Sequence, residues 1–315
     1  MDVSVIICAF TLERWEMLAQ AVVSVRRQTL PAREIILVID GNEALQHRAE
    51  AELPGTTVLA NRHGPGLSGA RQTGSELATS TILAFLDDDA IADPNWLEEL
   101  VAPYDDPHAL GVGGSVEPAW VANQPRWLPP EFYWVVGCTY AGLPSTGGRI
   151  RNPIGANMSM RAAVLARTGS FEPRLARTNR GTKMSGTAEE TEFCIRAARL
   201  HPGGYWAYRP SARARHAVPA ERTTGRYFVR RCRLEAAAKA ILTGLAGPSE
   251  GLASERAYVR SALPRAVARE LRQAARGHPI GLLRATVIVA GLAITALSYL
   301  EQRVRLRWSG EPGPA

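Results

Sequence analysis

The chain contains very few lysines. Lys183 and Lys239 are the only two among 37 basic residues, so arginine supplies nearly all the positive charge behind a formal net charge of +7. A genome that favours arginine codons would produce the same bias. Arginine also suits phosphates and anionic surfaces, because its planar guanidinium group binds two oxygens at once. No recognised nucleic-acid-binding motif accompanies the charge, so we expect no nucleic-acid partner.

Cysteines are also scarce and scattered. The chain has four, Cys8, Cys138, Cys194 and Cys232, and no two of them form a CxxC pair. The sequence therefore contains neither a zinc nor a redox motif. Scattered single cysteines are typical of a reducing compartment.

The apolar run at residues 3–8 has no basic segment before it. We interpret this run as a first strand and not as a signal peptide, and we expect the catalytic part to stay in the cytoplasm. With 315 residues, 46% hydrophobic and 21% charged, the chain can form one large domain or a domain with an appendage.

Strand-like and helix-like segments alternate in the first half of the chain. Apolar runs lie at residues 3–8, 34–40, 56–60 and 81–86. Segments of helical spacing lie at residues 13–28 and 67–77. This order predicts an α/β fold with a mostly parallel sheet flanked by helices. The apolar runs are continuous, which indicates a sheet buried on both faces.

Ligands of such sheets bind at the carboxyl ends of the strands. The residues that follow the predicted strands are 9–11, 40–41, 61–64 and 87–89. Residues 111–153 are rich in Trp, Pro and Gly, and we expect an irregular acceptor-side region there, although any single Trp is more often a core residue. Asp93 and Pro94 predict the start of a helix, and residues 188–200 predict another.

Three successive carboxylates, Asp87, Asp88 and Asp89, end the apolar run at residues 81–86. Like charges repel, so a fold keeps them together when a cation or hydrogen bonds compensate. Carboxylate oxygens suit Mg²⁺ or Mn²⁺, which substrate phosphates often share. The alternative is a solvated acidic turn.

A second run of carboxylates opens the helix predicted at residues 188–200. Glu189, Glu190 and Glu192 lie there, and the helix dipole alone would favour them. The glycine-rich residues 181–186 suggest a loop able to close over a ligand. His216 is a candidate ligand, although a lone histidine is more often structural.

Together these segments resemble family 2 glycosyltransferases with the GT-A fold over residues 2–235. The matching blocks are residues 4–10, 38–40, 66–71, 85–89, 155–159 and 189–193. Residues 134–138, 151–155 and 216–219 are similar to the branch that acts on polyprenyl or dolichyl phosphate-linked acceptors. The resemblance implies a nucleotide-diphosphate sugar donor (UDP-, GDP- or dTDP-linked) and a lipid-linked or glycan acceptor.

The resemblance also implies roles on the donor side. Asp40 would bind the base or ribose, and Arg71 would lie near the nucleotide. Asp87 would contact the ribose or metal-bound water, and Ala9 and Asp88 would join the donor site.

A metal, Mn²⁺ or Mg²⁺, would be held by Asp89, which takes the last place of the family's DxD motif. His216 falls where a late histidine often completes the metal or diphosphate site. The metal would offset charge on the departing nucleotide.

On the acceptor side, Glu190 takes the place of the family's catalytic base, usually Asp. If Glu189 faces the acceptor instead, the assignment shifts by one residue. Asn157 and Met158 match the wall of the acceptor site, and Trp134 would join them. Residues 226–231 lack the QxxRW motif of processive members, which favours transfer of one sugar, with inversion.

The last third of the chain is basic and apolar. Residues 258–276 resemble a basic amphipathic helix, and residues 280–300 are long enough to span a bilayer, which takes ~20 residues. Basic residues flank both ends and prefer the cytoplasmic side. A spanning helix, a shallow or re-entrant helix and a buried soluble helix remain open, and we expect attachment to the cytoplasmic face of the membrane.

These patterns divide the chain into a catalytic domain (1–235), a basic amphipathic segment (236–278), a hydrophobic helix (279–303) and a polar tail (304–315). One alternative is a sugar-phosphate nucleotidyltransferase, which should carry a Gly-rich, Lys-containing phosphate loop that residues 9–20 lack. The other is a non-catalytic membrane scaffold, which would be expected to lose its acidic clusters. The sequence leaves the sugar, the base, the acceptor and the oligomeric state open.

Overall fold

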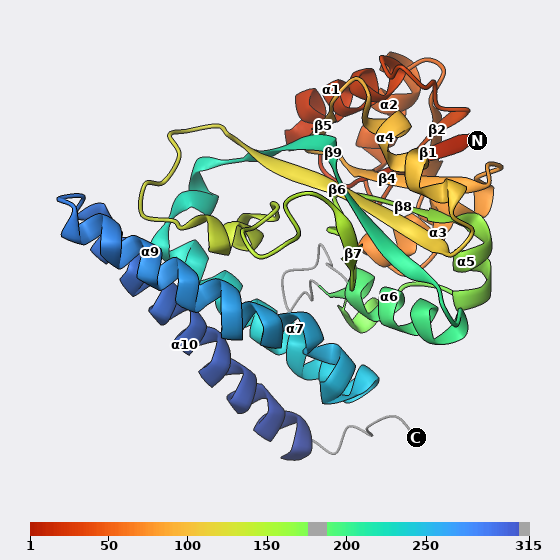
Figure 1. The fold of residues 1–315 in the computed structure, drawn as a ribbon. Helices are drawn as coiled ribbons and strands as arrows, with labels where there is room; N and C mark the ends of the chain where they lie inside the picture. Colours follow the sequence, from red (N-terminus) through yellow and green to blue (C-terminus); the bar gives the residue numbers. More distant parts are fainter. Residues whose placement is uncertain (176–187, 309–315) are drawn as a thin grey trace. The chain divides into compact units, whose positions relative to one another are not determined.

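A computed structural model describes residues 1–175 and 188–308 (Figure 1). The glycine-rich loop expected at residues 181–186 and the end of the polar tail, residues 309–315, lie outside the described residues. The described chain forms two compact units. The first comprises described residues of Met1–Glu117, Pro144–Ser185 and Glu189–Ala217, and the second comprises those of Pro118–Leu143, Gly186–Ala188 and Val218–Ala315.

The sheet has a parallel part and an antiparallel part. β1 pairs in parallel with β2 and β4, and β2 pairs in parallel with β3. The parallel strands, in spatial order, are β3 (Thr57–Ala60), β2 (Glu34–Ile39), β1 (Val3–Ala9) and β4 (Ile82–Asp87). The sheet continues through β8 (Asn157–Arg161), β6 (Ala109–Trp120), β9 (Tyr205–Val218) and β5 (Ala90–Ala92). β7 (Gly148–Ile150) pairs with β9.

Helices cover both faces of this sheet, as the continuous apolar strands predict. On one face, Val5 and Ile7 of β1 belong to a core shared with α1 (Trp15–Arg26), α2 (Glu43–Glu52) and α4 (Trp96–Val101). On the other face, Ile6 belongs to a core shared with α3 (Leu67–Leu77), α5 (Ala162–Thr168) and α6 (Glu189–Leu200). Successive strand residues point to opposite faces, so one apolar run serves both cores. The predicted α/β class is confirmed.

Two local expectations were wrong in part. The helix expected from Asp93 and Pro94 begins at Trp96, with Asn95 at its N-cap position. Only the first part of the stretch expected to be irregular, residues 111–120, belongs to β6, which runs to Trp120. A Cβ on Gly111 would collide with the ring of Trp206, and one on Gly114 would collide with a neighbouring carbonyl. These glycines permit close packing inside a strand, whereas composition alone indicated a loop.

The second compact unit is mainly helical. Its elements include η3 (Pro130–Val136), η5 (Ala220–Thr223), α7 (Gly225–Gly251), α8 (Ala253–Ala257), η6 (Tyr258–Ala262), α9 (Leu263–Ala275) and α10 (Ile280–Trp308). α10 packs against both α7 and α9. The boundary expected at residue 235 falls inside α7, whereas the compact units divide after Ala217.

Candidate active site

The acidic cluster lies where β4 ends, at the carboxyl edge of the parallel strands. Asp87 is the last residue of β4 and is in register with Cys8 of β1. Asp88 and Asp89 form the turn that leads into β5. β5 pairs antiparallel with β9, in a register that puts Ala90 opposite His216. Sheet pairing therefore brings a late histidine to the aspartates.

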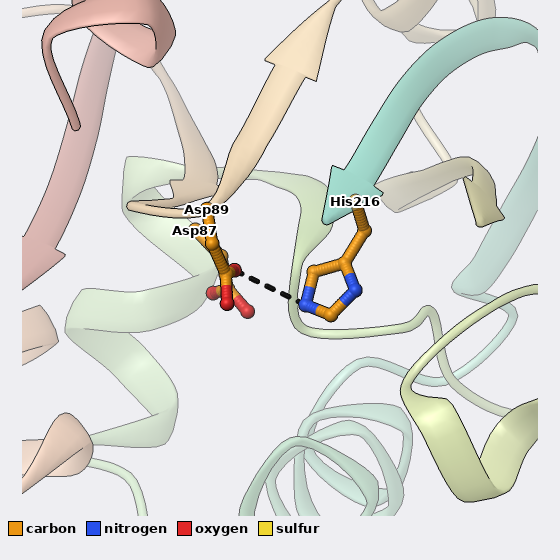
Figure 2. Close-up of side chains that lie close together, drawn as sticks. All are labelled: Asp87, Asp89 and His216. Carbon is orange, nitrogen blue, oxygen red and sulfur yellow. Dashed lines mark ion pairs between the residues drawn. The ribbon is translucent and has the colours of Figure 1, made fainter. Parts of the chain in front are cut away.

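Asp87, Asp89 and His216 form a compact set of potential metal ligands (Figure 2). One ligand atom from each lies within 4.8 Å of the others, and His216 Nε2 is 3.1 Å from Asp89 Oδ1. Asp89 is 6% exposed and His216 is 4% exposed. His216 Nδ1 is buried and has no hydrogen-bond partner within the described chain. Two carboxylates and an imidazole around one point fit a divalent cation. The metal-binding roles expected of Asp89 and His216 stay predictions.

Arg14 is a member of the cluster that sequence reasoning missed. Its Nη1 lies 2.9 Å from Asp88 Oδ1 and 3.2 Å from Asp89 Oδ2. Burial, together with the charge of Asp89, raises the pKa of Asp88 to about 7, although Arg14 opposes the shift. Arg14 thus compensates part of the like-charge repulsion. The available signal was its position, a few residues after the end of β1.

Arg71 links the acidic cluster to the start of α6. It is 2% exposed, and its guanidinium donates to the Gly155 carbonyl at 3.0 Å. It also lies 3.4 Å from Glu189 Oε1 and 4.0 Å from Asp87 Oδ1. The sequence predicted Arg71 near the nucleotide, and the structure places it beside two of the predicted site carboxylates.

This ion pair distinguishes Glu189 from Glu190. Glu189 is buried, at 3% exposure, against Arg71, whereas Glu190 is only partly buried. Glu190 is therefore the more accessible of the two carboxylates. Its predicted role as the base stays a prediction.

Asp40 follows β2 and organises the next loop at the same edge of the sheet. Its Oδ1 accepts a hydrogen bond from Asn61 Nδ2 at 2.8 Å, and its Oδ2 accepts one from the Gly66 amide at 2.9 Å. Asp40 thus ties residues 61–66 to the sheet. Its contact with a base or ribose stays a prediction.

Ala9 and Cys8 end β1. Ala9 is buried, and its carbonyl accepts a hydrogen bond from the Asp40 amide at 2.8 Å. Burial raises the pKa of the Cys8 thiol to about 12, so Cys8 stays protonated and is unsuited to act as a nucleophile. The donor contact expected of Ala9 stays a prediction.

Two residues expected at the acceptor are buried in the first unit. Asn157 and Met158 are both 0% exposed. Asn157 Oδ1 accepts from Trp96 Nε1 at 2.7 Å, and Asn157 Nδ2 donates to the carbonyls of Ser115 and Ala212. These contacts give Asn157 a structural role, and its acceptor contact stays a prediction. Trp134 lies in η3 of the second unit, packed against Phe132, and its acceptor contact also stays a prediction.

Replacing Asn157 by aspartate is expected to destabilise the fold by at least about 3 kcal/mol. The carboxylate would lose both N–H donors and face two carbonyl oxygens without water. Chemical denaturation would measure the free energy of unfolding. Asn42→Asp is the matched control, because aspartate caps a helix as well as asparagine, and Asn42 caps α2 at a partly exposed position where its Nδ2 donates to one carbonyl of the described chain, that of Phe10. Equal stability of the two variants would contradict the structural role.

Comparison with known proteins identifies the class. Residues 4–169 match the family described as glycosyl transferase family 2. A curated relative, glucosyl-dolichyl phosphate glucuronosyltransferase from Haloferax volcanii, is 36% identical over 229 residues, which is 71% of each chain. The protein belongs to glycosyl transferase family 2 and is a glycosyltransferase, as the sequence motifs predicted.

Solved structures support the GT-A fold. GalNAc-T7 with UDP, GalNAc and Mn²⁺ superposes with a TM-score of 0.52 at 18% identity, over 74% of this chain. This chain spans about half of that protein, 47% of its length. The mannosyltransferase PcManGT from Pyrobaculum calidifontis, in complex with GDP-Man and Mn²⁺, superposes with a TM-score of 0.56 at 22% identity, over 98% of this chain and 88% of that one. At these identities the likeness concerns the fold alone.

Proposed function

We propose that the enzyme transfers one sugar from a nucleoside-diphosphate sugar to a hydroxyl of a lipid-linked acceptor, with inversion. The observation that carries this proposal is the set Asp87, Asp89 and His216 at the carboxyl edge of the sheet, in which Asp89 and His216 are buried and Asp87 is partly exposed. A diphosphate needs positive charge to bind and to leave. A site of this composition can supply that charge through a metal.

Asp89, His216 and Asp87 would hold Mn²⁺, with Mg²⁺ as the alternative. The bound ion would offset negative charge on the diphosphate leaving group. The superposed structures of GalNAc-T7 and PcManGT both contain Mn²⁺, which supports Mn²⁺ first. Arg14 lies beside the same carboxylates and would remain a fixed positive charge at the site.

Glu190 would accept the proton of the acceptor hydroxyl as its oxygen attacks the anomeric carbon. A positioned general base contributes about 10²–10⁴-fold to the rate. Glu189 is less suited to this task, because Arg71 holds it in the core. Arg71 would act as a positioning residue that fixes the start of α6 relative to Asp87.

A lipid-linked acceptor is supported by the relative from Haloferax volcanii, whose name specifies a dolichyl phosphate-linked substrate. It is also supported by α10, a helix long and apolar enough to enter a membrane. The acceptor would be presented at the cytoplasmic face. The donor base and sugar stay open among UDP-, GDP- and dTDP-linked sugars.

Nucleotide release by the full-length enzyme in membranes would test this function. UDP-, GDP- and dTDP-sugars would be supplied with a polyprenyl-phosphate-linked acceptor and Mn²⁺, Mg²⁺ or EDTA. We expect release with one donor, strictly dependent on the acceptor and abolished by EDTA. Donor binding in calorimetry without release under any acceptor would instead favour a scaffold.

A further inference from the structure

The positive charge of the chain is concentrated near its C-terminus. Residues 1–255 contain 27 basic and 27 acidic residues. Residues 256–308 contain ten arginines and two glutamates, Glu270 and Glu301. Glu270 is buried and paired with Arg269. The excess charge therefore belongs to one segment of the second unit, and arginine-codon preference alone does not explain that position.

The same segment carries most of the exposed apolar side chains. Nine of the fifteen large apolar side chains that are exposed in the described chain lie in residues 256–308. Six of them lie on α10 before its last residue, and Trp308, which is 86% exposed, ends the helix. Water-exposed apolar surface of this extent marks an interaction site.

Most of the exposed apolar residues of α10 follow one stripe, and Leu283 lies beside it. Six positions at helical spacing share this side, Leu282, Val289, Ala293, Leu297, Leu300 and Val304, and all are exposed. The stripe runs from residue 282 to residue 304, which is 22 steps along the helix or about 33 Å at 1.5 Å per residue. It contains no charged residue, although Glu301 and Arg305 lie beside its end.

The opposite side of α10 is covered by protein along its length. Near its start, Gly281 lies against the backbone of Glu270 and Ala274 in α9. In its middle, Gly291 contacts the rings of Phe132 and Phe228. Near its end, Tyr299 and Arg303 hydrogen-bond Thr243 of α7.

The covering helices carry charged groups beside these contacts. One turn before Thr243, Lys239 of α7 pairs with Glu235 at 3.3 Å and with Glu255 at 2.7 Å. In α9, Arg269 pairs with Glu131 at 2.8 Å and with Glu270 at 2.6 Å. If α10 crossed a bilayer in this packing, α7 and α9 would carry these ions into hydrocarbon, which is strongly unfavourable. Lipid can therefore reach the stripe side only.

The neighbouring helix α9 carries exposed basic residues together with an exposed apolar side chain. Arg265 and Arg272 on α9 and Arg276 at its C-cap are exposed together with Leu271. Arginines beside an apolar helix face attract anionic lipid headgroups.

We propose that α10 lies in the plane of an anionic membrane, with the stripe Leu282–Val304 inserted into one leaflet and the arginines of α9 at the headgroups. The helix does not cross the bilayer. This proposal rests on the membrane attachment of the proposed function and specifies its geometry. Its tests measure vesicle binding and the depth of the helix in the membrane, so that a negative result can be told apart from a lack of sugar transfer.

Flotation of the purified full-length enzyme with vesicles tests the surface. We expect binding to phosphatidylcholine vesicles containing about 30% phosphatidylglycerol that is at least tenfold stronger than binding to pure phosphatidylcholine, and that weakens with salt. Leu297→Glu with Leu300→Glu should lower binding at least tenfold. The control Leu77→Glu, at an exposed leucine of the first unit, should leave binding unchanged. Equal binding of all three proteins would overturn the proposal.

Spin labels report the orientation. One cysteine at a time would be introduced at position 282, 289, 297 or 304, in a Cys8→Ala background whose three remaining cysteines are buried. Each introduced cysteine would be labelled and its depth in the anionic vesicles measured. An in-plane helix gives one shallow depth at all four positions. A depth profile that is greatest near 289–297 and shallow at both ends would mean a spanning helix and overturn the proposal. The proposal would also be overturned if the spin labels on the stripe contacted a second copy of the chain and no lipid.

Discussion

Replacing Asp89 by asparagine is expected to lower kcat/KM for the nucleotide sugar by at least about 10²-fold. Asparagine keeps the shape of the side chain but removes the negative charge that would hold the metal, and one lost electrostatic contact at a transition state costs about 10²–10³-fold. Asp89 lies 3.1 Å from His216 and within reach of Asp87, so the loss disrupts the whole ligand set.

Steady-state kinetics with Mn²⁺, together with Mn²⁺ binding followed by calorimetry, would measure this effect. We expect weaker Mn²⁺ binding and a near-native melting temperature. Asp93→Asn is the matched control, because Asp93 lies on the same segment and faces Arg215 at 3.8 Å. If Mn²⁺ activated the Asp89→Asn enzyme as strongly as the wild type, Asp89 would not be a metal ligand.

Replacing Glu190 by glutamine is expected to lower kcat by about 10²–10⁴-fold, the usual contribution of a general base. Glutamine has the same size but cannot accept a proton. The KM for the donor should change by less than about threefold, because the base acts on the acceptor and not on the nucleotide.

Two neighbours on α6 serve as controls for Glu190. Glu192→Gln removes a carboxylate that pairs with Arg196 at 2.7 Å, and should keep most of the activity. Glu189→Gln breaks the buried pair with Arg71, and should lower stability together with activity. If Glu189→Gln lost turnover while folded, and Glu190→Gln kept it, the base would be Glu189.

The parallel half of the sheet could be predicted closely from the sequence, because three of its four strands, β1, β2 and β4, are continuous apolar runs buried on both faces. The helix expected at residues 67–77 has the same bounds as α3. β6 was not predicted, because its glycines are required by close packing against residues distant in the chain, such as Trp206. Local composition does not predict such contacts.

The candidate site shows the same division. Asp87 and Asp89 could be found because they stand at the end of a recognisable strand. Their meeting with His216 depends on the pairing of β5 with β9, and the family resemblance supplied that expectation. Arg14 was missed because a single arginine after a strand has no distinctive pattern, and only the fold brings it to Asp88. Glu189 and Glu190 could be told apart only by burial.

The pairing of β5 with β9 also bears on how the molecule is assembled. Asp89 and His216 are separated by the central third of the chain, and the short β5 has only three residues with which to set its register. Contacts so distant in sequence close late in folding, because the intervening loop must be ordered first. High-affinity Mn²⁺ binding should therefore develop late in refolding, and the ion should stabilise the finished fold by mass action. Metal affinity would then measure the fraction of the protein that has completed folding.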